Sequence, residues 1–156
     1  MCFTLHIATS CDLPRRPWDE ADRHVWVGDV PDYATAVRAH FSLPVVTYVG
    51  SDLNCGCGFR HLSFQNGGWP GEEEWVISEG LLDTEGTETN HRELHALLTD
   101  ALRHSLVVEL YGCWADDFRE KTEGEQDIQP DSILSDRFFF RERVLYRLRA
   151  TAPNGT

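Results

Sequence analysis

The chain has 156 residues, with 26 acidic and 14 basic side chains, and its net charge at pH 7 is −12. Apolar residues make up 41% of it, including five Trp, four Tyr and eight Phe, which excludes disorder of the whole chain. The charge disfavours nucleic acids and anionic membranes as partners, because both are polyanions. The length fits a single domain over 1–156 with no linker.

The first third of the chain predicts three strands and one helix. Apolar and polar residues alternate over 2–8, which predicts a half-buried strand, and a second short strand is expected over 23–27. A helix is expected over 32–41, where apolar residues recur on one face. The β-branched and aromatic run 45–49 predicts a third strand.

Six of the twelve glycines lie within 50–71, which predicts a long, turn-rich loop of the kind that often carries function. A strand is expected over 75–77, although the acidic run before it could instead begin a helix. A leucine stripe predicts a helix over 91–104 with Asn90 as its N-cap.

Further strands are expected over 106–113 and over 138–148, the second being one long strand or a hairpin. The segment 115–136 between them is predicted to be a polar connection. This order of elements predicts an α+β fold with a mainly antiparallel sheet and two principal helices, 32–41 and 91–104. A mixed sheet is the alternative, because the helix 91–104 could connect parallel neighbours.

The sequence indicates a cytoplasmic protein. No apolar run approaches the roughly 20 residues that span a bilayer, and the first residues lack the basic stretch of a signal peptide. The five cysteines are odd in number and irregular in spacing, which does not suit a disulfide framework.

The most specific motif is Cys55-Gly56-Cys57-Gly58-Phe59-Arg60-His61. Two thiols one residue apart, with His61 four residues further on, could supply three ligands to one metal ion, and zinc is the default for sulfur and nitrogen ligands. Zinc sites usually separate paired thiols by two to four residues, so this spacing departs from the usual pattern. A further ligand would come from a distant part of the chain, and the candidates are Cys113, Cys11, His91 and His95.

A second interpretation is that the same thiols act as nucleophiles or redox groups. Arg60 or His61 could lower the pKa of Cys55 or Cys57, since a nearby positive charge favours the thiolate. Cys2 is a further candidate nucleophile if Met1 is removed, because its own amine could act as the base. The structural alternative is a tight, glycine-rich turn with two small buried thiols for Cys55 and Cys57, and a small buried residue at the start of a strand for Cys2.

His91 and His95 share one helix face, but the Glu of a zinc protease helix directly follows the first His, and here that position is Arg92. That motif is therefore absent, and the two His are candidate ligands only if the thiols lie close to them.

Two carboxylates interrupt apolar strand faces and must be paired, protonated or functional. Glu142 falls on the apolar face of the strand 138–148 and is a candidate catalytic residue. Glu109 interrupts the strand 106–113 in the same way. If the two strands are antiparallel neighbours, we expect Glu109 to pair with an Arg of the last strand.

The negative charge is concentrated in two segments, 72–88 with a net charge of −7 and 116–136 with −6, while 137–149 carries +4. The alternative to a metal or thiol site is therefore a noncatalytic interaction module, in which these acidic segments recruit a basic protein partner. The arginines of 137–149 could be neutralised by the preceding acidic segment or form a local anion-binding patch.

The run Tyr48-Val49-Gly50-Ser51 followed by Cys55-Gly56-Cys57-Gly58-Phe59, together with Met1-Cys2 and His40-Phe41, resembles a pattern in a family of small, uncharacterised bacterial proteins. The resemblance implies a cytosolic single-domain protein and no particular activity, cofactor or catalytic residue. The sequence leaves open whether the protein is an enzyme and what its oligomeric state is.

Overall fold

The computed structural model describes residues 2–62 and 86–150. Within them, a six-stranded sheet has the order β2-β3-β1-β5-β8-β6 and is antiparallel except for the last pair, β8 and β6. Its strands are β1 (Phe3–Thr9), β2 (Trp26–Asp29), β3 (Val45–Gly50), β5 (Val107–Trp114), β6 (Gly124–Ile128) and β8 (Val144–Arg149). Two short strands, β4 (His61–Leu62) and β7 (Phe140–Arg141), form a separate parallel pair.

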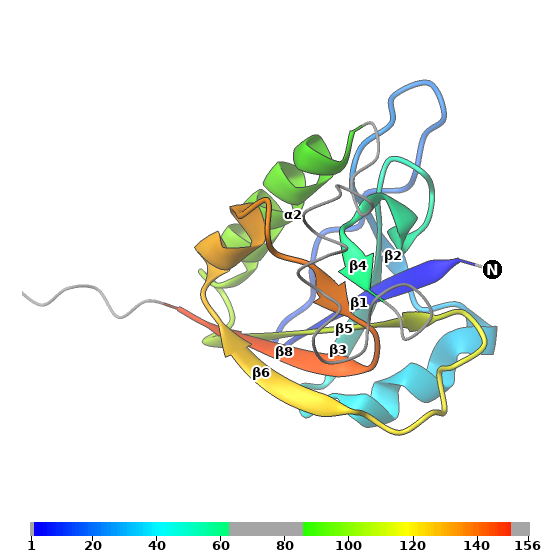
Figure 1. Cartoon of the computed structure of the whole chain (residues 1–156), viewed down its shortest axis with the longest axis vertical. Helices are drawn as coiled ribbons and strands as arrows, with labels where there is room; N and C mark the ends of the chain where they lie inside the picture. The colour runs from blue at the N-terminus through cyan, green and yellow to red at the C-terminus, as the bar shows by residue number, and fades with distance from the viewer. Residues whose placement is uncertain (1, 63–85, 151–156) are drawn as a thin grey trace, which may run out of the picture.

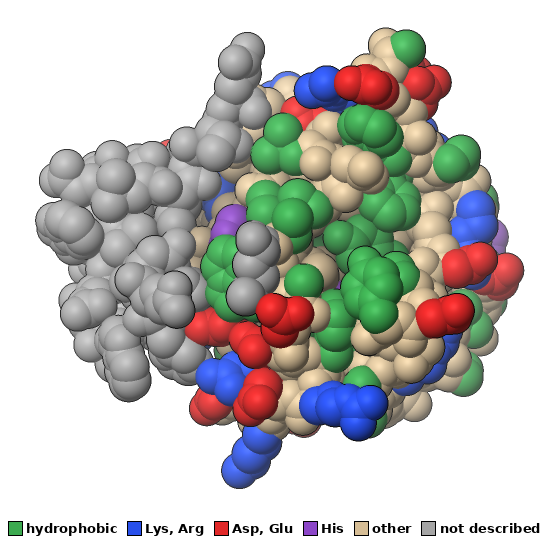
Figure 2. All heavy atoms as spheres, turned by 90° about the vertical axis from the view of Figure 1, so that its right-hand side faces the viewer, with side chains coloured by type: hydrophobic (Ala, Val, Ile, Leu, Met, Phe, Trp, Pro, Cys, Tyr) green, Lys and Arg blue, Asp and Glu red, His purple; other side chains and the backbone are tan. Residues whose placement is uncertain are grey.

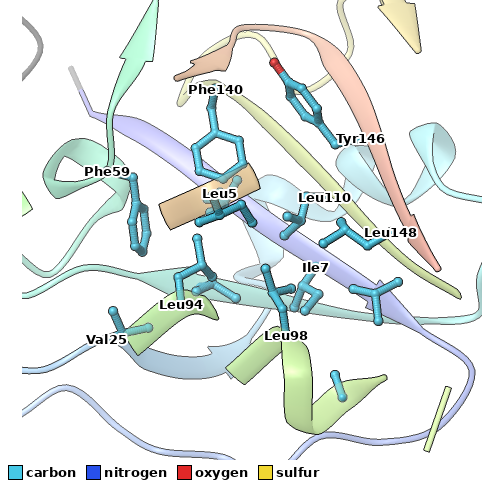
Figure 3. Packing of buried hydrophobic residues seen from close by; sticks show 14 of the residues in the cluster. Leu5, Ile7, Val25, Phe59, Leu94, Leu98, Leu110, Phe140, Tyr146 and Leu148 are labelled. Carbon is cyan, nitrogen blue, oxygen red and sulfur yellow. The ribbon is translucent and has the colours of Figure 1, made fainter. Parts of the chain in front are cut away.

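Helices cover both faces of the large sheet (Figure 1). The helix α2 (Thr87–Ala101) and the 3-10 helix η3 (Pro130–Leu134) lie on one face, and η1 (Asp32–His40), also a 3-10 helix, lies on the other. Figure 3 shows Leu94 and Leu98 of α2 beside Leu5 and Ile7 of β1, all of them fully buried. The alternation along β1 therefore places one set of side chains under α2 and the other set under η1.

These elements confirm the expected α+β class and the mixed, mostly antiparallel sheet. Among the described residues, no helix combines the length and the hydropathy needed to cross a membrane. The predicted strand 75–77, the loop residues 63–71 and most of the acidic segment 72–88 lie outside the described residues.

Both predicted helices are present, with differences. The first is a 3-10 helix, whose period of three residues puts Ala34 and Val37 on the buried side. The second begins at Thr87 and ends at Ala101, so Asn90 lies inside it and does not cap it. Gly86 precedes it with a φ of +87°, a left-handed conformation that glycine adopts without strain.

The region 115–150 differs most from its prediction. The polar connection contains β6 and η3. The expected long strand or hairpin 138–148 is instead two strands, β7 and β8, with a turn at Glu142 and Arg143 between them; β7 pairs with β4, and β8 pairs with β5 and β6. Arg143 has a φ of +59°, which ends the extended run. Because the turn spans two residues, the apolar alternation continues in phase across it, and the sequence pattern conceals the break.

The predicted pairing of Glu109 is confirmed. Glu109 lies opposite Arg147 in the antiparallel pair β5–β8, and Arg147 Nε donates to Glu109 Oε1 over 3.3 Å. Arg147 also binds Glu125 of β6, and Arg143 lies 3.2 Å from Glu123. These two arginines are thus neutralised by the acidic segment that precedes them.

Candidate functional site

Three cysteine side chains meet at one end of the large sheet. The Sγ atoms of Cys2, Cys55 and Cys57 all lie within 4.8 Å of one another. Across 2–62 and 86–150 they form the one group of three or more cysteine, histidine or acidic side chains that is close enough to hold a metal ion. Cys2 directly precedes β1, and the other two cysteines belong to the segment after β3, Cys55 directly before the short 3-10 helix η2 (Gly56–Gly58) and Cys57 within it.

The loop is closed by Ser51, which follows β3 directly. Ser51 Oγ donates to Cys55 O over 2.6 Å and accepts from Gly58 N over 3.1 Å, while Ser51 N donates to Cys55 O over 2.8 Å. Gly56 to Gly58 form the single 3-10 turn η2, so Ser51 binds the residue before this turn and the last residue of it, with Cys57 between them.

Glycine is required in this turn by close approach to its neighbours. A Cβ atom at Gly56 would lie 2.8 Å from the backbone oxygen of Phe3, and one at Gly58 would lie 2.5 Å from Ser51 Oγ. The flanking glycines therefore bring the turn, with its two thiols, directly onto β1 beside Cys2.

Helix α2 fixes the loop from the other side. Asn90 Nδ2 donates to Asp52 Oδ1 over 2.7 Å and to Gly58 O over 3.2 Å, and Asn90 Oδ1 accepts from Asp52 N over 3.1 Å. Asn90 is buried, so these bonds are shielded from water. The side chain predicted to cap the helix thus holds the cysteine loop in place.

The sulfur of Cys57 is the most anionic of the three. Hydrogen bonding with Cys55 lowers the pKa of Cys57 to about 5, and the Phe3 N–H and the charge of His61 act in the same direction against the cost of burial. The same interaction raises the pKa of Cys55, because Cys55 then keeps the proton that the two share. Phe3 N donates to Cys57 Sγ over 3.2 Å, and Cys57 N donates to Cys55 Sγ over 3.4 Å.

His61 does not belong to the group of three thiols, but its ring has a defined orientation. Its Nδ1 lies 2.7 Å from Phe59 O, and a carbonyl oxygen can only accept, so Nδ1 carries a proton. The ring stacks on Phe3 at 4.4 Å and meets the ring of Trp114 edge-on at 5.6 Å. A metal-binding histidine is commonly held in this way, by a hydrogen bond from the ring nitrogen that does not bind the metal.

The site opens to solvent. Cys2 is exposed, and Cys55 and Cys57 are partly exposed. Figure 2 shows the side of the molecule from which the N-terminus projects in Figure 1. A broad group of hydrophobic side chains, a class that includes cysteine in this figure, lies on this side. An ion could therefore reach the thiols without opening the fold.

The other predicted cysteine ligands lie elsewhere. Cys113 is buried on the opposite face of the sheet, where its Sγ is 3.7 Å from Thr4 Oγ1. Cys11 lies beyond the far end of β1, and its Sγ is 3.5 Å from His104 O. The structure does not bring either of them to the three clustered thiols.

The two helix histidines contact other partners. His91 is buried, its Nε2 accepts from Arg60 N over 2.8 Å, and its Nδ1 donates to Ile133 O over 2.9 Å. Both ring nitrogens are therefore used by the fold. His95 Nε2 lies 2.8 Å from Asp131 Oδ1, so both histidines attach α2 to η3.

Glu142 is buried in the turn between β7 and β8, and its backbone N–H donates to Leu62 O over 3.0 Å. It does not belong to the cysteine cluster. Burial, and to a smaller extent the charge of Glu142, raise the pKa of Cys113 to about 11.

The sequence did not identify Cys2 as a partner of the loop cysteines. The alternation over 2–8 does place Cys2 at the end of a strand, but only strand pairing brings it beside η2.

No family model, curated protein or solved structure matches this chain.

Proposed function

We propose that this chain binds a thiophilic metal ion, Zn²⁺ in the first instance, through Cys2, Cys55 and Cys57. The observation that carries the proposal is the approach of the three Sγ atoms to within 4.8 Å of one another. A tetrahedral zinc ion with Zn–S bonds of about 2.3 Å separates its sulfur ligands by roughly 3.8 Å. The thiols therefore need to move little to enclose the ion.

His61 Nε2 is the fourth ligand in this proposal. In the neutral form of the ring, the Nδ1–H bond to Phe59 O leaves the lone pair on Nε2, as metal binding requires. Three thiolates and one imidazole form the Cys3His set of closed zinc sites, which leave no position for substrate. The ion would tie the start of β1 to the turn η2, so we propose a binding and stabilising role for it, without chemistry on a substrate.

A reducing compartment such as the cytoplasm suits this role. All five cysteines are free, and zinc binds the thiolate form only. The alternative of an acidic docking module receives less support within 116–136, because Glu123 and Glu125 are paired with Arg143 and Arg147 of the same chain.

Metal analysis of protein purified without a polyhistidine tag tests the proposal. We expect one zinc ion per chain, and a loss of affinity of about 100-fold or more when Cys57 is replaced by Ser, because one of four ligands is removed. Cys11→Ser is the matched control, since Cys11 lies away from the cluster. Wild-type protein that binds no metal, or a Cys57→Ser variant that binds it equally well, would overturn the proposal.

A further inference from the structure

The start of β1 contacts the side chain of Cys57 directly. The N–H that donates to Cys57 Sγ over 3.2 Å belongs to Phe3, the residue directly after Cys2. The two sulfur atoms are at most 4.8 Å apart, and a disulfide bond requires about 2.05 Å. Closing that gap is within reach of a side-chain rotation, because Cys2 is exposed and precedes the first residue of β1.

The neighbouring pair, Cys55 and Cys57, is less suited to bond. A disulfide between them would close a small ring through Gly56 alone and would distort the η2 turn. That turn cannot move freely, because Gly56 rests against the β1 backbone and Ser51 binds both of its ends. Cys2 is thus the one thiol of the three that can turn toward Cys57 without rebuilding the loop.

We propose that hydrogen peroxide oxidises this site to a Cys2–Cys57 disulfide and thereby releases the metal ion. This inference rests on the proposed metal site and adds its regulation. The described cluster supplies both thiols of the reaction, the one that is oxidised first and the one that resolves it.

The chemistry balances with hydrogen peroxide as the only oxidant. The Cys57 thiolate attacks one peroxide oxygen, so that an S–O bond forms, the O–O bond breaks and hydroxide leaves. The sulfur loses two electrons and becomes a sulfenic acid. The Cys2 sulfur then attacks it, the S–S bond forms and the S–O bond breaks. The oxygen leaves as water with the Cys2 proton, and the first hydroxide is protonated by solvent.

Oxidation removes two of the three thiolates at once. The disulfide sulfurs carry no charge, and Cys55 with His61 alone offers two ligands where a zinc site needs four. The ion is therefore released in proportion to the disulfide formed. Reduction of the bond by a dithiol, which is itself oxidised, restores both thiols and the site.

The chain provides its own unreactive thiols for comparison. Cys113 is fully buried on the other face of the sheet, and Cys11 lies beyond the opposite end of β1. Neither belongs to the group of three thiols. Both should remain free when Cys2 and Cys57 are joined.

Peptide mapping by mass spectrometry after stoichiometric hydrogen peroxide tests the inference on metal-free protein. We expect a linked peptide that joins Cys2 to Cys57, two hydrogens lighter than the separate peptides, in both the wild type and Cys55→Ser. The inference is overturned if the main product joins Cys55 to Cys57, or if Cys57 becomes a sulfinic acid without a disulfide.

A second arm uses the zinc-loaded protein and a chromogenic zinc chelator. Zinc should appear in solution at the rate at which the Cys2–Cys57 peptide appears, and a dithiol should reverse both changes. Zinc that stays bound after the disulfide has formed would overturn the inference. The peptide mapping on metal-free protein does not depend on bound zinc. It therefore tests disulfide formation even if the protein proves not to bind the metal.

Discussion

The backbone N–H of Phe3 donates to Cys57 Sγ over 3.2 Å, across 54 positions of the sequence. This contact brings the first strand, the turn η2 and the thiol of Cys2 together. It also stabilises the anionic form of Cys57, whose pKa falls to about 5 mainly through its hydrogen bond with Cys55. Both its geometry and its electrostatic effect can be tested by substitution.

In metal-free protein, we expect Cys57 to react with iodoacetamide with a midpoint near pH 5. The Cys55→Ala variant should shift that midpoint toward the usual thiol range of about 8.5, because it removes the thiol whose hydrogen bond stabilises the Cys57 thiolate most. Labelling rates at Cys57 between pH 4 and pH 9, determined by peptide mass spectrometry, give the midpoint in each protein. An unchanged midpoint in the variant would show that the pair is not coupled.

Gly56→Ala should destabilise the protein by about 1–3 kcal/mol and weaken metal binding. The new Cβ would lie 2.8 Å from the Phe3 oxygen, and backbone on both sides limits the adjustment. Denaturant unfolding and a zinc titration measure the two effects. Gly124→Ala is the matched control, since nothing lies within 4 Å of a Cβ there. Equal stability of the two variants would contradict the packing described for η2.

His6 makes folding sensitive to acid. It is fully buried between Tyr48 and Phe118, its ring nitrogens lack partners among the described residues, and burial lowers its pKa to about 3, with the charges of Arg38 and His40 adding to this. The unfolded chain binds a proton near pH 6.5, so stability falls as the pH drops from about 6.5 toward 3, by several kcal/mol in total.

The variant His6→Phe should lose part of that pH dependence. We expect the free energy of unfolding to decrease less steeply between pH 6.5 and 4 in the variant than in the wild type. Urea unfolding at several pH values measures the difference. Parallel curves for the two proteins would mean that His6 does not carry this sensitivity.

Glu109→Gln should cost about 3 kcal/mol. Glu109 is fully buried, and its carboxylate accepts from Ser42 Oγ over 2.5 Å, from Ser42 N over 2.9 Å and from Arg147 Nε. Removing its charge leaves the buried side of Arg147 without its anion. Glu125→Gln, which removes the exposed partner of the same arginine, should cost less than about 1 kcal/mol. Equal costs in denaturant unfolding would contradict this difference.

Glu109 shows what the sequence could predict. A carboxylate on an apolar strand face demands a counter-charge, and the arginines of the last strand were the nearest candidates in the sheet. The leucines of α2 and the alternation of β1 likewise follow from local periodicity. These features depend on neighbours along the chain or on one strand pairing, and the structure agrees with them.

Features that depend on tertiary contact were missed. β6 is a polar strand whose position comes from its pairing with β8, and its own sequence shows little apolar alternation. Cys2 joins the loop cysteines only because η2 rests on β1. Cys2 lies alone before the strand, so its sequence neighbourhood shows no spacing typical of a ligand motif. The loop cysteines were recognisable because only one residue separates them in the sequence.

X-ray absorption spectroscopy of the zinc-loaded, untagged protein tests the central claim most directly. The account predicts three sulfur ligands at about 2.3 Å and one nitrogen at about 2.0–2.1 Å, with Cys2→Ser reducing the sulfur number to two. A first shell of oxygen and nitrogen alone, or a sulfur count that Cys2→Ser leaves unchanged, would contradict it.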